Sequence, residues 1–353
     1  MHTLKKRFNS KKSLKRILVT GSQGFIGSYV CNELLQNDYQ VIGVDNFSKY
    51  GPVTRAHDKD ENFTLIKEDC ASNEFVKIFE NEKFDYIIAG AAMIGGISYF
   101  HKYAYDLLSM NERIISNTFD LAIEQFKKGF LKKILVLSSS MVFENVNSWP
   151  TKESDLMNCP PPSSTYGFQK LSCEYFARGA FEQYQLPYTI VRPFNCVGVG
   201  EDEAVGDHEI TSGNVKLTLS HVVPDLILKC LKGQNPLHIL GSGSQIRHYT
   251  NGYDIAKGVR ICLENENAVN NDFNISSSVS TSVLELAQMI WEKINPSIPF
   301  KFISDPPFEY DVEKRVPDTQ KAKEMLGFEA QISLNDSLDE IISWMKEKHH
   351  ILN

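Results

Sequence analysis

Thr20-Gly-Ser-Gln-Gly-Phe-Ile-Gly27 is the stretch of sequence that decides the fold. It overlaps the end of the apolar run Ile17-Leu-Val-Thr20, which has the composition of a buried strand. It also opens an amphipathic stretch that predicts a helix over 24–35. A strand, a glycine-rich turn and a helix in this order predict the first unit of an α/β protein.

Each glycine of this turn has a separate physical use. Gly21 permits the tight turn, Gly24 lets a backbone approach a diphosphate, and Gly27 allows the helix to pack closely on the strand. The unpaired N–H groups and the partial positive charge at the start of a helix suit phosphate oxygens. We therefore expect a dinucleotide here, with further contacts from the same turn by Gln23, Phe25 and Ile26.

Short apolar runs and longer amphipathic stretches alternate as far as about residue 190. The predicted strands are 17–20, 40–44, 64–67, 86–89 and 133–138, and the main predicted helices are 107–126 and 164–184. Continuous apolar strands that alternate with helices are typical of a parallel sheet covered on both faces, with right-handed crossovers. The predicted fold class is α/β, with a Rossmann-type doubly wound parallel sheet.

The regular alternation of predicted strands and helices ends after Leu186. Strands are expected at 188–191 and 273–275, a helix at 221–232, and a Pro-rich stretch at 296–317. We expect three parts: a basic, disordered tail at 1–15, an NAD-binding Rossmann domain at 16–190 with a returning strand near 272–276, and mainly a smaller C-terminal substrate-binding lobe at 191–353. The lobe is expected over the carboxyl ends of the strands, where open α/β sheets bind ligands.

Composition is that of a globular protein and argues against several partners. Hydrophobic residues make up 42% of the chain and charged residues 23%, unlike a disordered or fibrous protein. The formal net charge of -7 gives no basic field for nucleic acid. The longest weakly polar run, 87–97, is too short and too rich in Gly and Ala to cross a bilayer. We expect neither nucleic acid nor a membrane as a partner.

The seven cysteines include no C-x-x-C pair and indicate neither a zinc site nor a disulfide framework. The cytoplasm is the expected compartment, and no metal is expected. The acidic loop 201–209, with His208, has no metal-ligand spacing, and acidic loops are commonly only solvated. Seven Lys or Arg and no acid among the first sixteen residues fit a solvated tail, which we favour, or a targeting peptide.

An acidic residue stands where the ribose of a dinucleotide would lie. The second predicted strand ends at Val44 and is followed by Asp45, at the spacing from Gly21 that such sites use. A carboxylate there accepts both hydroxyls of the adenosine ribose and repels a 2′-phosphate, so NAD is predicted rather than NADP. Asn46 joins this site. Asp69, after the third strand, is a candidate contact to adenine or a plain turn carboxylate.

Tyr166-Gly-Phe-Gln-Lys170 begins a predicted helix and carries the candidate chemistry. Residues four apart share a helix face, so the phenol and the ammonium point into one cleft. A phenol in water titrates near ~10, and an ammonium and the positive nicotinamide ring would both favour the phenolate that a base requires. The serine run 138–140 offers a hydroxyl that can share the substrate oxygen. An exposed helical pair is the alternative, but the neighbouring motifs on one sheet edge favour catalysis.

Together these residues resemble the extended short-chain dehydrogenase/reductases, specifically the NAD-dependent epimerase/dehydratase family of nucleotide-sugar enzymes. The likeness runs from Arg16 to Trp344. Its motifs here are Thr20–Gly27, Ala89-Gly-Ala-Ala92, Asn111, Ser139 with Tyr166 and Lys170, Arg192-Pro-Phe-Asn195, Gly241–Arg247 with Asp254-Ile-Ala, and Arg315–Asp318 through Leu326-Gly-Phe. The resemblance implies NAD, a nucleotide-diphosphate sugar as substrate, and a homodimer formed through helices 107–126 and 164–184.

The resemblance also implies roles for individual residues. The implied catalytic residues are Tyr166 as base, Lys170, and Ser139 as the catalytic hydroxyl, with Ser140 as the fallback. The implied cofactor contacts outside the glycine turn are Ala91, Asn111 and Lys170, and the implied substrate contacts are Ser140, Asn195, Arg247 and Arg315. Arginine forks suit diphosphate oxygens, and a surface ion pair is the alternative for each arginine.

The residues after Ser139 separate the reactions of the family. Its 4,6-dehydratases carry an Asp-Glu pair there, and similar decarboxylases carry a Glu at the second place. Here the two places are Ser140 and Met141, so both reactions are disfavoured. The family's usual Tyr-Gly that follows is Phe143-Glu144, which predicts a different substrate wall.

His221 leaves a second chemistry open. Segments 95–97 and 220–224 are similar to those of GDP-fucose synthase and its relatives, in which a histidine at the place of His221 and a cysteine at that of Met141 invert carbons beside a ketone. His221 is thus a candidate general acid near neutral pH, and a helix cap or a buried histidine is the alternative. The missing cysteine and the NAD-type Asp45 argue against the full epimerase–reductase reaction.

What remains needs only hydride transfer and one base. The favoured reaction is inversion at C4 through a transient 4-keto sugar, with Tyr166 as base, as in enzymes similar to UDP-galactose 4-epimerase. A nucleotide-sugar dehydrogenase or reductase uses the same residues and is the runner-up. A non-catalytic dinucleotide-sensing protein is the hypothesis from another class, and the intact Ser139, Tyr166 and Lys170 argue against it.

Overall fold

The computed structural model describes residues 14–94, 103–201, 210–212, 215–217, 221–307 and 312–350. Some of the features discussed above lie outside the described residues. They are the tail up to residue 13, segment 95–97, Ser220, and the acidic loop beyond Glu201 with its His208.

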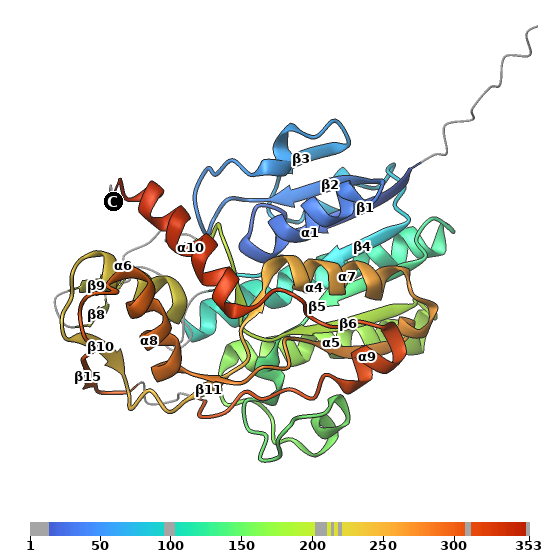
Figure 1. Cartoon of the computed structure of the whole chain (residues 1–353). Coiled ribbons are helices and arrows are strands. Elements are labelled where there is room, and N and C mark those ends of the chain that lie inside the picture. Colours follow the sequence, from blue (N-terminus) through green and yellow to red (C-terminus); the bar gives the residue numbers. More distant parts are fainter. Residues whose placement is uncertain are drawn as a thin grey trace, which may run out of the picture.

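A seven-stranded sheet forms the centre of the molecule (Figure 1). Its strands lie in the order β13-β6-β5-β4-β1-β2-β3, and each neighbouring pair is parallel. Their bounds are β1 Lys15–Thr20, β2 Tyr39–Asp45, β3 Phe63–Lys67, β4 Tyr86–Ala89, β5 Lys133–Leu137, β6 Tyr188–Pro193 and β13 Asn271–Ile275. The strand order reverses between β1 and β4, the place where open α/β sheets bind ligands. The predicted α/β class with a doubly wound parallel sheet is confirmed.

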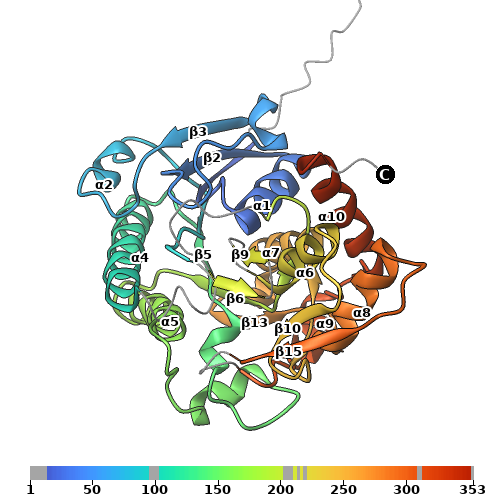
Figure 2. The same ribbon diagram turned by 90° about the vertical axis from the view of Figure 1, so that its left-hand side faces the viewer.

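Helices cover both faces of the sheet (Figure 2). One face carries α1 Phe25–Gln36, α7 Gly252–Glu264 and α9 Gln320–Leu326, and the other carries α2 Phe75–Ile78, α4 Ala104–Lys127 and α5 Thr165–Tyr184. Successive strand residues enter opposite cores: Ile17 and Val19 join the first, and Leu18 joins the second. Full burial of such a side chain contributes about 1.5–3 kcal/mol. A sheet with two buried faces therefore needs the continuous apolar strands seen in the sequence.

A smaller lobe lies beyond the carboxyl ends of the sheet strands (Figure 1). One apolar core, which includes Trp291, joins three helices to a strand: α6 Val222–Leu231, α8 Val283–Ile294, α10 Leu334–Lys348 and β10 Leu237–Leu240. The strand β15 Phe302–Asp305 pairs with β10 and is mainly exposed. Shorter strand pairs are β7 Cys196–Val197 with β12 Thr250–Asn251, β8 Ile210–Ser212 with β9 Val215–Leu217, and β11 Ile246–Arg247 with β14 Thr281–Ser282. Short 3-10 helices are η1 Ala56–Lys59, η2 Ser140–Phe143, η3 Glu153–Asn158 and η4 Glu266–Ala268.

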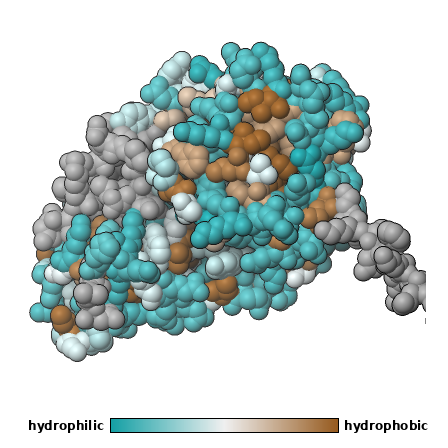
Figure 3. Space-filling view, turned by 90° about the horizontal axis from the view of Figure 1, so that it is seen from above, coloured by the Kyte–Doolittle hydropathy of each residue, from teal (hydrophilic) through white to brown (hydrophobic). Residues whose placement is uncertain are grey.

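The face seen from above is mainly hydrophilic, with one group of hydrophobic side chains on it (Figure 3). Within the described part of the chain, no helix combines the length and the apolar character needed to cross a membrane. Among the same residues, no three His, Cys, Asp or Glu side chains gather in a way that could hold a metal ion.

Candidate active site

The glycine turn connects β1 to α1 in a conformation that requires glycine. Gly21 has a φ of 76°, and a Cβ there would lie 2.9 Å from the Cα of Ala91 in the turn after β4. A Cβ on Gly27 would collide with the carbonyl oxygen of Gly21. Gly24 caps α1 without a side-chain hydrogen bond, and the first turn holds no acidic residue. The start of α1 thus presents backbone N–H groups for which no acidic residue of its own first turn competes, which fits the diphosphate of a dinucleotide.

Asp45 ends β2 with both carboxylate oxygens held by backbone. Oδ2 accepts the N–H of Gln23 at 3.0 Å, and Oδ1 accepts the N–H of Phe47 at 2.8 Å. Burial raises the pKa of Asp45 above its usual value, while these two hydrogen bonds lower it. Each carboxylate oxygen has a second lone pair. The carboxylate is therefore fixed beside the glycine turn and can still accept ribose hydroxyls.

Arg55 steadies the glycine turn, and the sequence reasoning missed it. Its Nε and Nη2 donate to the carbonyl of Gln23 at 3.1 and 2.9 Å, and its Nη1 donates to the carbonyl of Gly200 at 3.1 Å. The Gln23 amide donates to Asp58 at 2.8 Å. His57, in the same loop, is buried, and burial lowers its pKa to about 4. The loop between β2 and β3 carries no motif that would have marked these residues.

Asn46 and Asp69 follow β2 and β3 and make hydrogen bonds within their own turns. Asn46 Oδ1 accepts the N–H of Ser48 at 2.9 Å, and Asp69 Oδ1 accepts that of Ala71 at 2.8 Å. The structure therefore shows the turn-carboxylate geometry for Asp69, and its contact to adenine stays a prediction.

Ala91 and Asn111 lie on the opposite side of the glycine turn. The N–H of Ala91 donates to Thr20 Oγ1 at 3.1 Å, which ties the turn after β4 to the end of β1. Asn111 of α4 accepts the N–H of Met93 at 2.6 Å and donates to its carbonyl at 2.9 Å. Asn111 therefore shapes the loop after β4, which borders the predicted cofactor site.

Tyr166 and Lys170 lie on one face of α5, and each is only 6% exposed. Lys170 Nζ donates to the carbonyl of Leu137, the last residue of β5, at 2.9 Å and lies 5.9 Å from the centroid of the Tyr166 ring. Ser139 lies two residues after the end of β5, and its Oγ accepts the N–H of Met141 at 3.2 Å. The structure thus brings three of the four predicted catalytic residues together at the carboxyl end of β5, while the fourth, His221, lies at the start of α6.

Glu144 connects the turn after Ser139 to the start of α5. The η2 turn after Ser139 contains the buried Ser140 and ends at Phe143, with Glu144 as its C-cap. The Glu144 carboxylate accepts the N–H and the hydroxyl of Ser164, each at 2.9 Å. Ser164 in turn caps α5 by accepting the N–H of Gly167 at 3.0 Å. A carboxylate at a helix N-terminus stabilises the helix. Enzymes of the family that this sequence resembles usually have glycine at the position of Glu144.

The predicted substrate residues come from neighbouring segments at the junction with the smaller lobe. The carbonyl of Asn195, after β6, accepts the N–H of Thr250, and the N–H of Arg315 donates to the carbonyl of Ile246 at 3.0 Å. Arg247 is buried, and its Nη1 donates to the carbonyl of Ile246 at 2.9 Å. Their contacts to a substrate stay a prediction.

His221 stands at the N-cap of α6, without a side-chain cap bond. Its Nδ1 contacts the carboxylate of the buried Glu201. The helix-cap interpretation describes its backbone, while its side chain forms a histidine–carboxylate pair. A role for this pair in proton transfer stays a prediction.

A parallel sheet with a glycine turn and a fixed carboxylate, beside buried tyrosine and lysine side chains and a half-buried serine, defines a class of protein. It is the class of dinucleotide-dependent enzymes that act on hydroxyl groups.

The chain is similar to known proteins along nearly its whole length. Residues 17–276 match the model of the NAD dependent epimerase/dehydratase family. The chain is 28% identical over 334 residues to a putative UDP-glucose 4-epimerase of Methanocaldococcus jannaschii, covering 94% of this chain and 99% of that protein. It is 27% identical over 351 residues to UDP-glucuronic acid decarboxylase 1 of Danio rerio, covering 98% and 77%. The crystal structure of UDP-glucose 4-epimerase from Thermotoga maritima with UDP-glucose matches with a TM-score of 0.79 at 28% identity, covering 95% and 99%.

The chain therefore belongs to the NAD-dependent epimerase/dehydratase family. The resemblance inferred from the sequence is confirmed, and so are the enzymatic nature of the protein and NAD as its cofactor. The family joins nucleotide-sugar epimerases, decarboxylases and dehydratases, and the relatives above include both an epimerase and a decarboxylase.

Proposed function

We propose that the protein is an NAD-dependent nucleotide-sugar epimerase that inverts C4. The observation that carries this proposal is the environment of Met141. Met141 is 5% exposed and packs with Tyr166 and Leu107, at the place where dehydratases and decarboxylases similar to this chain carry a Glu. A thioether neither gives nor takes a proton at neutral pH. Inversion at C4 requires no second acid or base beside the tyrosine.

The side chains around Tyr166 suffice for this reaction. Tyr166 takes the proton of the C4 hydroxyl, while the Ser139 hydroxyl donates a hydrogen bond to the same oxygen. Lys170, held by the carbonyl of Leu137, keeps an ammonium near the phenol and favours its ionised form. Bound NAD supplies the acceptor, and then the donor, of the C4 hydride. Once the 4-keto sugar has rotated to present its opposite face, the hydride returns to C4 and Tyr166 returns the proton to the C4 oxygen. The sugar therefore undergoes no net oxidation.

Asn195, Arg247 and Arg315 are the side chains proposed to hold the substrate diphosphate. They lie on adjoining segments where the sheet meets the smaller lobe. Arginine forks match phosphate oxygens. The relatives described above are named for UDP-sugars, which makes UDP-sugars the first substrates to test. The division into an NAD-binding part (16–190) and a substrate-binding part (191–353) belongs to the same proposal.

A homodimer through α4 and α5 completes the proposal. Large side chains are exposed on these helices: Tyr105 is 79% exposed, Phe168 47% and Tyr175 64%. Phe168 and Tyr175 are seven residues apart in α5 and so share a face. Exposed aromatic residues on one face support an interface with a second copy.

The test is incubation with UDP-sugars in deuterated water, followed by NMR. Inversion at C4 gives the epimer without solvent deuterium, because the hydride stays within the site. Deuterium at C3 or C5 would assign the chemistry to the His221–Glu201 pair, and net NADH would indicate a dehydrogenase. Tyr166→Phe should bind NAD and lose turnover, and full activity in that variant would overturn the mechanism.

A further inference from the structure

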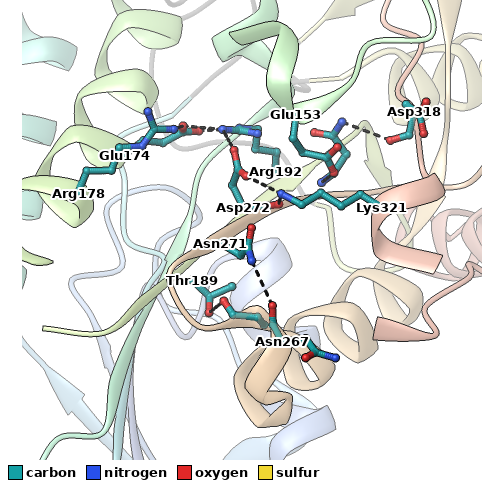
Figure 4. A network of polar contacts seen from close by, with 12 residues as sticks. Glu153, Glu174, Arg178, Thr189, Arg192, Asn267, Asn271, Asp272, Asp318 and Lys321 are labelled. Carbon is teal, nitrogen blue, oxygen red and sulfur yellow. Dashed lines mark hydrogen bonds and ion pairs between the residues drawn. The ribbon is translucent and has the colours of Figure 1, made fainter. Parts of the chain in front are cut away.

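A network of ion pairs joins α5, β6, β13 and α9 (Figure 4). Glu174 of α5 and Arg192 of β6 are fully buried and paired, with Arg192 Nε and Nη2 each 2.7 Å from a Glu174 oxygen. Arg192 Nη2 also donates to Asp272 of β13 at 2.7 Å, and Lys321 donates to Asp272 at 2.9 Å. Arg178 Nη2 also lies 3.5 Å from Glu174 Oε2, so the two carboxylates meet three cations and neither is buried without a partner.

The Glu174–Arg192 pair holds the segment of Ser139 at both of its ends. On one side, Ser138 Oγ donates to Glu174 Oε1 at 2.7 Å. On the other side, the Arg192 guanidinium lies 5.1 Å from the ring centroid of Phe143, the last residue of η2. In the chain, Ser139 therefore lies between Ser138 and Phe143, and the Glu174–Arg192 ion pair contacts both of these residues.

Glu174 also belongs to the helix that carries the base. It follows Lys170 by one helical turn and Tyr166 by two, on the same face of α5. Lys170 and Glu174 make their contacts with consecutive residues, Leu137 and Ser138, at the end of β5. These two links fix the position of α5 along its axis relative to β5, which ends two residues before Ser139.

We propose that Glu174, braced by Arg192, is a positioning residue that fixes Ser139 against Tyr166 and Lys170. The inference rests on the proposed function, which gives Ser139 and Tyr166 their roles. Buried ion pairs are weak contributors to stability compared with apolar side chains of the same size, so stability alone gives little reason for this one. The serine hydroxyl and the phenol must reach one substrate oxygen together, and looser placement lowers rate more than binding.

The decisive variant is Ser138→Ala, which removes one hydrogen bond and leaves the ion pair intact. Its matched control is Ser172→Ala. Ser172, on α5, likewise donates its hydroxyl to a carboxylate, that of Glu112 on α4, at 2.9 Å, but this contact lies away from Ser139. We expect Ser138→Ala to lower kcat about 10-fold or more with little change in KM, while Ser172→Ala keeps the wild-type kcat. Ser138→Thr restores the donor and should recover most of the loss.

A second measurement does not depend on turnover. The absorbance of the Tyr166 phenolate is followed against pH as the difference between each protein and its Tyr166→Phe counterpart, with NAD bound. Because Lys170 and Glu174 hold the same strand end, Ser138→Ala should form the phenolate at higher pH than wild type. A wild type that converts no nucleotide sugar would defeat the proposed function, and this titration would still decide the inference. The positioning role of Glu174 is overturned if Ser138→Ala leaves the phenolate titration unchanged. It is also overturned if Ser172→Ala changes the titration or kcat as much as Ser138→Ala does.

Discussion

The carboxylate of Glu144 holds Ser164 by two hydrogen bonds of 2.9 Å, one from the backbone N–H and one from the hydroxyl. The turn that begins after Ser139 and the helix that carries Tyr166 are therefore joined at their adjacent ends. The family usually has glycine at the position of Glu144, and glycine has no side chain that could make this contact.

Glu144→Ala should destabilise the protein and slow the reaction. Hydrogen bonds to a charged group contribute about 1.5–3 kcal/mol, and the variant leaves the start of α5 without this acceptor. Glu144→Gln keeps one acceptor oxygen and should lose less. Urea unfolding of the three proteins measures the difference, and equal midpoints would show that the contact has no energetic weight.

Asp45→Ala should weaken NAD binding and reduce discrimination against NADP, because the carboxylate that accepts the ribose hydroxyls and repels a 2′-phosphate is lost. We expect the ratio of the two Kd values to fall by about 10-fold or more, the effect of one charge–charge contact near a surface. Asp60→Ala is the control, since Asp60 accepts a turn N–H in the same way, from Asn62 at 2.8 Å. Fluorescence titration with each dinucleotide reports the ratio, and an unchanged ratio would remove Asp45 from the ribose site.

Lys133 should destabilise the protein most below about pH 8. It is buried with Nζ 2.8 Å from the carbonyl of Cys262, and burial lowers its pKa to about 8. The unfolded chain therefore binds more protons between pH 8 and ~10.4, so this group's contribution to stability rises with pH across that window.

Lys133→Met should accordingly be more stable than wild type near pH 7, by up to about 3 kcal/mol. This difference in unfolding free energy should decrease toward pH 10. The neighbouring Lys132 is exposed and paired with Asp85, so Lys132→Met is the control and should show no such gain. Unfolding free energies in urea at pH 7 and pH 10 are compared. A difference in unfolding free energy that is the same at both pH values would contradict the lowered pKa of Lys133.

His57 should make the folded protein sensitive to acid. Burial lowers its pKa to about 4, below the ~6.5 of an unfolded histidine. The stability that depends on its neutral form is complete above pH 6.5 and is lost as the pH falls toward 4. Compared with wild type, His57→Phe should lose less stability between pH 7 and pH 5, whereas His350→Gln at an exposed site should behave as wild type. Melting temperatures at the two pH values decide the matter.

Tyr175→Glu should disrupt the proposed homodimer. A carboxylate in the centre of an apolar contact is left without a partner and costs several kcal/mol. Light scattering after size exclusion should give a dimer for wild type and a monomer for the variant. Tyr253→Glu, at a residue 49% exposed on α7, is the control. A wild-type protein that is already monomeric would end this part of the proposal.

Local patterns in the sequence predicted the parts of the structure that local physics determines. The run at Ile17 and the glycines that follow fix a strand and a turn over a few residues, and the four-residue spacing of Tyr166 and Lys170 fixes their common helix face. The predicted start of α4 was three residues late, because its first turn has no cap residue that marks it. Such boundaries depend on packing as much as on composition.

Contacts between distant segments gave no such signal. Arg192 was noticed only as part of a strand-end motif, yet it pairs with Glu174 and Asp272 on two other elements. The two-residue strands β11 and β14 are too short to show a period of alternation. Their pairing depends on tertiary packing, which a pattern along one segment does not contain. For Glu174, the continued four-residue spacing after Lys170 was the one available hint.

The last strand of the sheet is contributed late in the chain. β13 occupies the edge beside β6, and it brings Asp272 to Arg192. During synthesis on the ribosome, a nascent chain that has reached about residue 200 has made β6 but not its neighbour. It exposes an unprotected strand edge that invites pairing with other chains, and its Arg192 has met one of its two carboxylates. Completion of the seven-stranded sheet therefore waits for a segment translated some eighty residues later, and a chaperone would protect the exposed strand edge during that interval.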